Sequence, residues 1–385
     1  MNTGWKLIGT LPLLASLIVG CAGEEDSIKM ATTPVVKSKF IPVQLWSSKV
    51  GDGVGRYFSK LTPVIAYDKV FAADRNGIVS AIDLQSGRTL WCINFSNEMP
   101  TLFSGGITAS YRKLYLGTET GELIVLDEKT GVVVWRTKTK GEILSRPLVD
   151  EGIVVVNSSL GVLSAYEAET GEQLWSFSNN IPNLTLRGDS SPISISGGIF
   201  WGMANGRVGA AYIDNGNIIW QQTISNPKGG TEIARLVDID STPVVSGSML
   251  YAVGYNGKLV AIDLHSGRTV WKRSYSSSTD ILVVGSYLFL ITDEDHVVAL
   301  DARSGTRIWI NINLEHRQLT PPALISGYVV VGDRKGYLHW LNHETGEFVA
   351  QQRLDDSGIS VPPIQVDDGY LVITRSGSLS KRRIQ

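Results

Sequence analysis

The sequence predicts an all-β protein, an eight-bladed β-propeller with four antiparallel strands in each blade. Three observations predict this class: a Gly–Trp string recurs along the chain, each repeat is long enough for four short strands, and an incomplete repeat at the C-terminus is complemented at the N-terminus. Repeats of about 40–50 residues with these features are typical of propellers, in which radial blades close into a ring.

The repeat is clearest between Gly77 and Trp91, and nearly the same string surrounds five further tryptophans. These are Trp135, Trp175, Trp220, Trp271 and Trp309, and each of the six has a glycine four residues before it. A seventh copy has Ala350 at the tryptophan position. An eighth begins at Ser376 and stops before that position, whereas Val43–Trp46 belongs to no preceding repeat. We therefore expect the N-terminal strand to form the outer strand of the last blade and close the ring, which removes an exposed sheet edge.

Within one repeat, the segments 241–245, 249–255, 258–263 and 268–271 read as four strands joined by hairpins. The Asn-Gly pairs that begin at 76, 205 and 256 suit two-residue type I′ turns, because glycine accepts a positive φ. Each tryptophan is predicted to be a wedge between blades, since so large a side chain is rarely left in water. Carboxylates recur eight residues before the tryptophans, which indicates that they brace a turn and do not catalyse; they are Asp83, Asp127, Glu167, Asp263 and Asp301.

The N-terminus reads as a targeting segment, with one cation at Lys6 and an apolar run from Leu7 to Val19. The string Ile18–Cys21 resembles the bacterial lipoprotein signal, which implies a signal peptide over 1–20 and lipid attached to Cys21. We expect a flexible tether over 21–40 and the propeller over 41–385. Ala22 follows the cysteine where the family's inner-membrane retention signal has Asp, so the resemblance implies the outer membrane, facing the periplasm. An ordinary signal peptide with an incidental cysteine is the alternative.

Charge and composition indicate neither nucleic-acid binding nor a cofactor. Beyond the first twenty residues the chain has 34 basic and 37 acidic side chains, so it lacks the excess of positive charge that is typical of nucleic-acid-binding proteins. The histidines at 265, 296, 316, 339 and 343 are mostly in different repeats, and no metal site is expected. Cys92 is expected to be a small buried apolar side chain. We predict no catalytic residue.

Function is expected where the repeats differ, since loops tolerate insertion and blades do not. From the tryptophan position to the proline that opens the next blade there are 12 residues in three repeats, 17 over 46–63 and 175–192, and 23 over 220–243. The last two are neighbours and should emerge on one face. They carry apolar and charged side chains suited to protein docking: Leu184, Leu186, Arg187, Asp238 and Asp240. The alternative is that the leucines pack under their own loop and the acids only solvate it.

The strings Ala81–Trp91 and Ala261–Trp271 share the pattern Ala-x-Asp-x-x-Ser-Gly-x-x-x-Trp, which resembles the quinoprotein-type propeller repeat. With Cys21 and eight copies, the chain resembles the BamB family, lipoproteins of the outer-membrane β-barrel assembly (BAM) machinery. The resemblance implies a non-catalytic scaffold that helps β-barrel proteins to fold and insert. The segments 183–192 and 231–243 are similar to the family's two partner-binding loops. Leu184, Leu186, Arg187, Asp238 and Asp240 would then contact a POTRA domain of BamA.

Two other functions fit the same repeat. A quinoprotein dehydrogenase would need pyrroloquinoline quinone on the axis, usually with Ca²⁺, and longer loops to cap it. A propeller that binds polysaccharide or peptidoglycan would need exposed aromatic side chains around the channel mouth. Most tryptophans are accounted for by the repeat, although Trp5, Trp201 and Trp340 stand outside that position.

Overall fold

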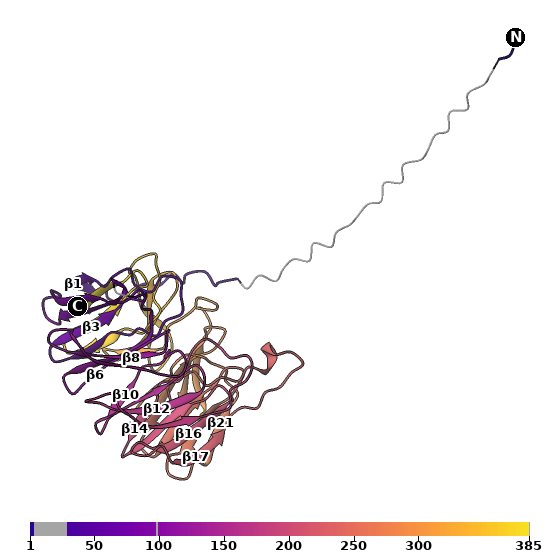
Figure 1. The fold of residues 1–385 in the computed structure, drawn as a ribbon. Helices are drawn as coiled ribbons and strands as arrows, with labels where there is room; N and C mark the ends of the chain where they lie inside the picture. Colours follow the sequence, from indigo (N-terminus) through magenta and orange to yellow (C-terminus); the bar gives the residue numbers. More distant parts are fainter. Residues whose placement is uncertain (4–28, 98, 385) are drawn as a thin grey trace.

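The computed structural model describes residues 1–3, 29–97 and 99–384. In them, 32 strands form eight four-stranded antiparallel sheets, which are arranged as blades around a common axis (Figure 1). The prediction of an eight-bladed propeller is confirmed. Among the described residues, no helix combines the length and the apolarity needed to cross a bilayer.

Seven blades are continuous in the sequence. Blade 1 holds β2 (Val64–Ala66), β3 (Lys69–Ala73), β4 (Ile78–Asp83) and β5 (Thr89–Asn94), followed by the 3₁₀ turn η1 (Phe95–Asn97). Blade 2 holds β6 (Phe103–Ser110), β7 (Lys113–Thr118), β8 (Glu122–Asp127) and β9 (Val133–Lys138). Blade 3 holds β10 (Leu148–Asp150), β11 (Ile153–Asn157), β12 (Val162–Glu167) and β13 (Gln173–Ser178). Blade 4 holds β14 (Ile193–Ile195), β15 (Gly198–Gly202), β16 (Arg207–Tyr212) and β17 (Ile218–Thr223), followed by η2 (Ile233–Arg235).

The second half of the chain repeats this plan. Blade 5 holds β18 (Val244–Ser246), β19 (Met249–Val253), β20 (Leu259–Asp263) and β21 (Thr269–Arg273). Blade 6 holds β22 (Leu282–Val284), β23 (Tyr287–Ile291), β24 (Val297–Asp301) and β25 (Arg307–Asn311). Blade 7 holds β26 (Ala323–Ile325), β27 (Tyr328–Gly332), β28 (Tyr337–Asn342) and β29 (Phe348–Arg353). Blade 8 holds β30 (Ile364–Val366), β31 (Gly369–Ile373), β32 (Ser378–Arg383) and, from the other end of the chain, β1 (Val43–Lys49).

Pairing of the N-terminal and C-terminal strands closes the ring. β1 runs antiparallel to β32, from Val43 opposite Arg383 to Lys49 opposite Ser378, with one bulge between Gln44 and Trp46. The first strand, β1, and the last strand, β32, therefore lie in one blade, and β1 lies beside the C-terminus (Figure 1). The predicted closure is confirmed.

Each repeat tryptophan joins its blade to the next, as predicted. The indole Nε1–H of Trp46 in blade 8 donates to the carbonyl of Leu84 in blade 1 over 3.1 Å, and that of Trp175 donates to Ile213 of blade 4 over 2.8 Å. The glycine four residues before each tryptophan has a second role that the sequence does not reveal. Gly216 has a φ of +70°, and a Cβ placed there would lie 2.7 Å from the Trp175 ring of the preceding blade. Glycine is required both by the turn and by the indole packed on it.

The recurring carboxylates brace turns, as predicted. Asp83 Oδ1 accepts hydrogen bonds from the backbone N–H of Ser86 over 2.7 Å and from its hydroxyl over 2.6 Å. These hydrogen bonds to Ser86 hold the pKa of Asp83 below its usual value. The same arrangement recurs at Asp263 with Ser266 and at Asp301 with Ser304.

The prediction of two-residue type I′ turns at the Asn-Gly pairs is wrong. A type I′ turn needs a positive φ at both central residues, but in the first two pairs only the glycine has one, +101° at Gly77 and +77° at Gly206. The backbone N–H of Asp74 donates to the carbonyl of Ile78, which leaves three residues in the loop. This geometry suits a type I turn followed by a left-handed glycine. In the third pair, Asn256 has the positive φ instead.

The described part of the expected tether lies along blade 7. The N–H of Lys39 donates to the carbonyl of Val349, and the N–H of Ala31 donates to the carbonyl of Glu315, both over 2.9 Å. Buried Arg317 completes this attachment, since its guanidinium donates to the carbonyl of Ala31 over 2.8 Å while it is paired with buried Asp333. Residues 4–28, and with them Cys21, the expected lipidation site, lie outside the described residues.

Cys92 is exposed, so the prediction that it is buried is wrong. It lies on β5, the outer strand of blade 1, where successive side chains point to opposite sides. Trp91 points toward the neighbouring blade, and Cys92 therefore points to solvent.

Candidate docking site

The two enlarged connections that the sequence singled out lie side by side on one face of the ring. The first loop (179–192) joins blades 3 and 4, and the second loop (224–243) joins blades 4 and 5. They are joined directly: the N–H of Leu186 donates to Asp238 Oδ1 over 2.9 Å, and the hydroxyl of Ser190 donates to the carbonyl of Ser241 over 2.9 Å. We call the face that carries the connections between blades the loop face.

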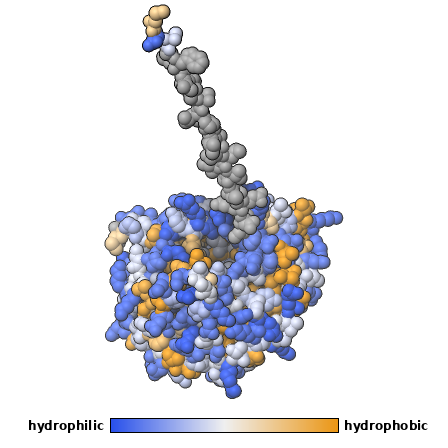
Figure 2. Space-filling model, turned by 90° about the vertical axis from the view of Figure 1, so that its right-hand side faces the viewer, coloured by the Kyte–Doolittle hydropathy of each residue, from blue (hydrophilic) through white to orange (hydrophobic). Residues whose placement is uncertain are grey.

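The first loop presents apolar and cationic side chains to solvent. Leu184 is 41% exposed, Ile181 and Arg187 are also exposed, and Leu186 is half-buried. Ile233 on the second loop is exposed as well. The alternative that the leucines pack under their own loop does not fit Leu184. The space-filling view shows apolar patches scattered among polar surface on one side of the molecule (Figure 2).

Asp238 and Asp240 are buried, which changes the role expected for them. Asp238 is 1% exposed and Asp240 is 5% exposed, so neither can touch a partner from its position in the isolated chain. The carboxylate of Asp238 instead fixes the backbone of the first loop at Leu186. Asp240 Oδ2 lies where it would meet a side chain at Gly188, so the two loops are in close contact here. The two acids shape the loop that carries Leu184 and Arg187.

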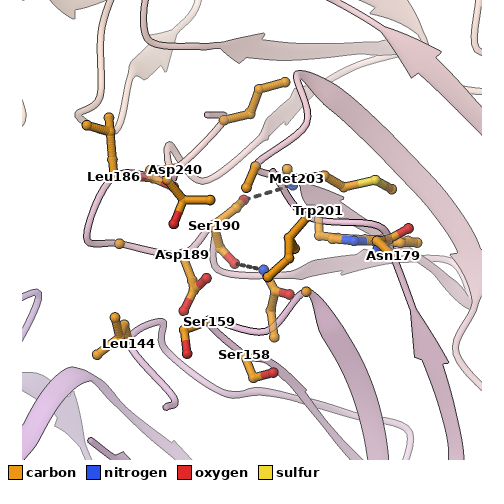
Figure 3. Close-up of a pocket in the computed structure, with 18 of the residues that line it drawn as sticks. Leu144, Ser158, Ser159, Asn179, Leu186, Asp189, Ser190, Trp201, Met203 and Asp240 are labelled. Atoms are coloured by element: carbon orange, nitrogen blue, oxygen red, sulfur yellow. Dashed lines mark hydrogen bonds between the residues drawn. The ribbon is translucent and has the colours of Figure 1, made fainter. Parts of the chain in front are cut away.

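The acids under the loops have raised pKa values. Burial raises the pKa of Asp240 to about 7, against the opposing effect of Lys60, and burial raises the pKa of Asp238 to about 6. Burial, together with the nearby charge of Asp240, also raises the pKa of Asp189. Asp189 and Asp240 line the same cavity of about 210 Å³, with Leu186 at its edge and Trp201 and Met203 behind (Figure 3).

Arg187 is held by two carboxylates from neighbouring blades. Its guanidinium lies 3.0 Å from Glu142 Oε2 and 3.0 Å from Glu119 Oε2. Glu119 is in turn paired with Arg75 over 2.8 Å, so the four side chains form one chain of ion pairs across blades 1 to 3. The guanidinium is pre-positioned and still half exposed, which suits recognition of a carboxylate or a carbonyl on a partner.

Sequence reasoning missed the residues that hold this patch from other blades. Glu119 and Glu142 lie in short connections whose lengths are ordinary, so no sequence signal separates them from solvated acids. Lys60 lies in the other 17-residue connection, whose length was a usable signal. Its ammonium donates to the carbonyls of Asp189, over 2.9 Å, and Asp240, over 2.7 Å.

Comparison with known proteins shows which family the chain resembles in sequence. The family model described as "Outer membrane protein assembly factor BamB" matches residues 75–311 and 295–384. The outer membrane protein assembly factor BamB of Vibrio cholerae is 52% identical over 370 residues, which cover 96% of each chain. The crystal structure of BamB from Moraxella catarrhalis superposes with a TM-score of 0.81 at 26% identity, covering 89% of this chain and 100% of that one.

The same fold occurs in enzymes of distant sequence. The quinohemoprotein alcohol dehydrogenase of Comamonas testosteroni has a TM-score of 0.70 at 15% identity, covering 89% of this chain and 76% of that one. At this identity the likeness shows the fold alone. Sequence match, blade number and ring closure agree, and this chain belongs to the BamB family of outer membrane protein assembly factors.

Proposed function

We propose that this chain is a non-catalytic scaffold of the BAM complex that docks on periplasmic POTRA domains of BamA through the loop face. The observation that carries the proposal is the direct bond between the two enlarged loops, in which Asp238 fixes the backbone of Leu186. The bond makes one preorganised surface of two loops, and a preorganised surface loses less conformational entropy when a partner binds. Leu184, Leu186 and Arg187 provide its contacts, and Asp238 and Asp240 position them.

The family supports the rest of the proposal. The relatives are named outer membrane protein assembly factors, so we place this chain in the outer membrane machinery, where it assists the folding and insertion of β-barrel clients. We further propose that the chain is anchored by lipid on Cys21 and faces the periplasm. A chain in which residues 1–20 are replaced by a signal peptide that is cleaved without lipidation, and Cys21 by Ala, should move from the membrane fraction to the soluble periplasmic fraction. Retention of this variant in the membrane would argue against the anchor.

The docking surface is tested by charge reversal. The double variant Leu184→Asp with Arg187→Glu should no longer co-purify with BamA from detergent-solubilised membranes, since it places two negative charges where an apolar side chain and a cation are expected to bind. The matched control is Leu174→Asp with Arg88→Glu, two exposed residues away from the loops. Thermal unfolding shows whether each variant is folded. Normal co-purification of the folded Leu184/Arg187 variant would refute this surface.

A quinoprotein dehydrogenase is the enzymatic alternative. Within 29–97 and 99–384, no three His, Cys, Asp or Glu side chains converge as metal ligands would. Asp280 and Asp295 line a cavity on the axis of the ring, and both accept backbone hydrogen bonds, Asp280 from the N–H of Thr242 and Asp295 from that of Leu319. Titration with pyrroloquinoline quinone and Ca²⁺ should give no saturable binding and no dye reduction. A saturable, reducing complex would establish the enzyme instead.

A further inference from the structure

A third loop, residues 50–63 between β1 and β2, presents two adjacent aromatic side chains on the loop face. Tyr57 is 51% exposed and Phe58 is 41% exposed. Residues around them anchor the loop, because Val50, Val54, Ser59 and Leu61 are buried. Exposing the apolar surface of two neighbouring aromatic side chains to water is unfavourable, and these two do not contribute to the core. Such an exposed pair on an anchored loop is typical of an interaction surface.

The third loop is held in place from blades 8, 1 and 2. Arg375 of blade 8 donates to the carbonyls of Gly55 and Tyr57, the latter over 2.7 Å. The guanidinium of Arg75 in blade 1 stacks on the Tyr57 ring, 4.1 Å from its centroid. At the far end, the N–H of Lys60 donates to the carbonyl of Ser104 in blade 2 over 2.7 Å. The aromatic pair is therefore presented in a defined position.

Lys60 joins the third loop to both docking loops. Its ammonium donates to the carbonyl of Asp189 on the first loop and to that of Asp240 on the second. The Phe58 ring lies 3.4 Å from where a Cβ on Gly188 would be, so Phe58 lies next to the first loop. Tyr57, Phe58, Leu186 and Arg187 line one axial cavity of about 770 Å³ that opens on the loop face.

We infer that the third loop is part of the docking surface, with Tyr57 and Phe58 as apolar contacts for the same POTRA domain that binds Leu184 and Arg187. This inference rests on the proposed function. Its support is continuity, because Lys60 of the third loop donates to both other loops and Phe58 lies beside Gly188 of the first loop, so a domain seated on the first loop meets Phe58 next. Arg56, exposed beside the pair and without an ion-pair partner among the described side chains, would face an acidic group of that domain.

Such a pair suits a binding hot spot. Aromatic side chains and arginine carry much of the affinity in protein interfaces, because they bury a large area with little rotamer entropy. Here the ring of Tyr57 is already stacked on Arg75, so little further ordering is needed on binding. Lys60 acts as a positioning residue, since its ammonium donates two hydrogen bonds to backbone carbonyls within this chain.

The test measures affinity for immobilised full-length BamA in detergent micelles. Tyr57→Ser with Phe58→Ser should weaken binding at least tenfold while the melting temperature stays within a few degrees. The matched control is Tyr212→Ser, since Tyr212 is also 51% exposed but lies at the end of β16, in a hairpin on the opposite face. If the serine variant loses stability, Arg56→Glu provides the same test, with an expected loss of several-fold.

Lys60 gives an independent readout. Lys60→Met should weaken BamA binding and speed amide exchange at Gly188 and Asp189, and Lys60→Arg should restore both, because only the cationic variant can donate to the two carbonyls. Unchanged binding by folded Tyr57/Phe58 and Arg56 variants, with binding abolished in the Leu184/Arg187 variant, would overturn this inference and leave the proposed function standing. Unchanged binding in all of them would overturn both.

Discussion

Trp340 on β28 and Ala350 on β29 are directly paired, so the large side chain is on the third strand of blade 7 and the small one on the fourth. In blades 1 and 3 to 6, a small alanine on the third strand faces the tryptophan of the fourth, as Ala165 faces Trp175. In blade 7 the tryptophan is on the third strand and the alanine on the fourth. Phe40, from the N-terminal segment, packs on the Trp340 ring with centroids 5.4 Å apart. At the position of the missing tryptophan, blade 7 therefore has Trp340 of its own third strand, covered by Phe40 from the N-terminal segment.

Phe40 should therefore stabilise the junction that lacks the repeat tryptophan. Phe40→Ala removes the contacts with Trp340 and Tyr328 and should lower the free energy of unfolding by about 1–3 kcal/mol, less than for a fully buried ring. Urea denaturation measures the change. Val35→Ala, in the same segment at a fully exposed residue, should change it by less than about 0.5 kcal/mol. Equal effects would show that the segment does not support blade 7.

Two glycines in blade 3 separate the cost of backbone strain from the cost of a steric clash. Gly171 has a φ of +75° and packs on the Trp135 ring, whereas Gly152 has a φ of +76° and no atom near the place of a Cβ. Gly152→Ala should cost about 1 kcal/mol, the penalty of a left-handed residue with a side chain. Gly171→Ala should cost a further 1–3 kcal/mol or so from overpacking. Similar thermal unfolding of the two variants would mean that the indole does not require glycine.

Asp240 should make stability fall as pH rises. Its pKa is raised to about 7 in the folded chain against 3.8 in the unfolded one, so the folded state binds more protons between these values. The contribution is fully present below about pH 4 and is lost as pH rises through about 7. Burial is the main cause of the raised pKa; Lys60 opposes it, while Asp238 and Asp280 add to it.

Asp240→Asn removes this dependence. The free energy of unfolding of this variant, minus that of the unchanged protein, should increase from pH 5 to pH 8, by at most about 1.4 kcal/mol per pH unit. Urea denaturation at the two pH values measures it. A difference that stays constant, or that falls with pH, would contradict the raised pKa.

Asp238 should act on binding through the first loop. Asp238→Ala removes the acceptor of the Leu186 N–H, so exchange of that amide should accelerate and affinity for BamA should fall, although Asp238 is buried. Hydrogen exchange read by NMR reports the amide directly. Loss of affinity with unchanged protection at Leu186 would show that Asp238 acts in another way.

The architecture could be predicted because each tryptophan and its glycine fix local geometry at a constant spacing. Ala350 could be recognised as a missing wedge, but its replacement could not, since Phe40 is more than 300 residues away in sequence. The outward direction of Cys92 follows from strand alternation once Trp91 is known to point inward.

The positions of the two enlarged loops were predicted, but the burial of their acidic side chains was not. Connection length identified both loops, and the residue types within them pointed to Leu184 and Arg187. The burial of Asp238 depends on a contact with a residue 52 positions away, which no local pattern encodes. The connection that contains the third loop is as long as the one that contains the first. Its contact with the other two loops depends on hydrogen bonds from Lys60 to residues more than 100 positions away, which the sequence does not reveal.

The most direct test of the docking surface is site-specific photo-crosslinking in intact cells. A photoreactive phenylalanine analogue at Leu184 should give a covalent adduct with BamA, identified by mass spectrometry. The same analogue at Leu174, equally exposed but on the outer edge of blade 3, should give none. Adducts with BamA from Leu174 and none from Leu184 would place the partner on the rim of the ring and contradict docking through the loop face.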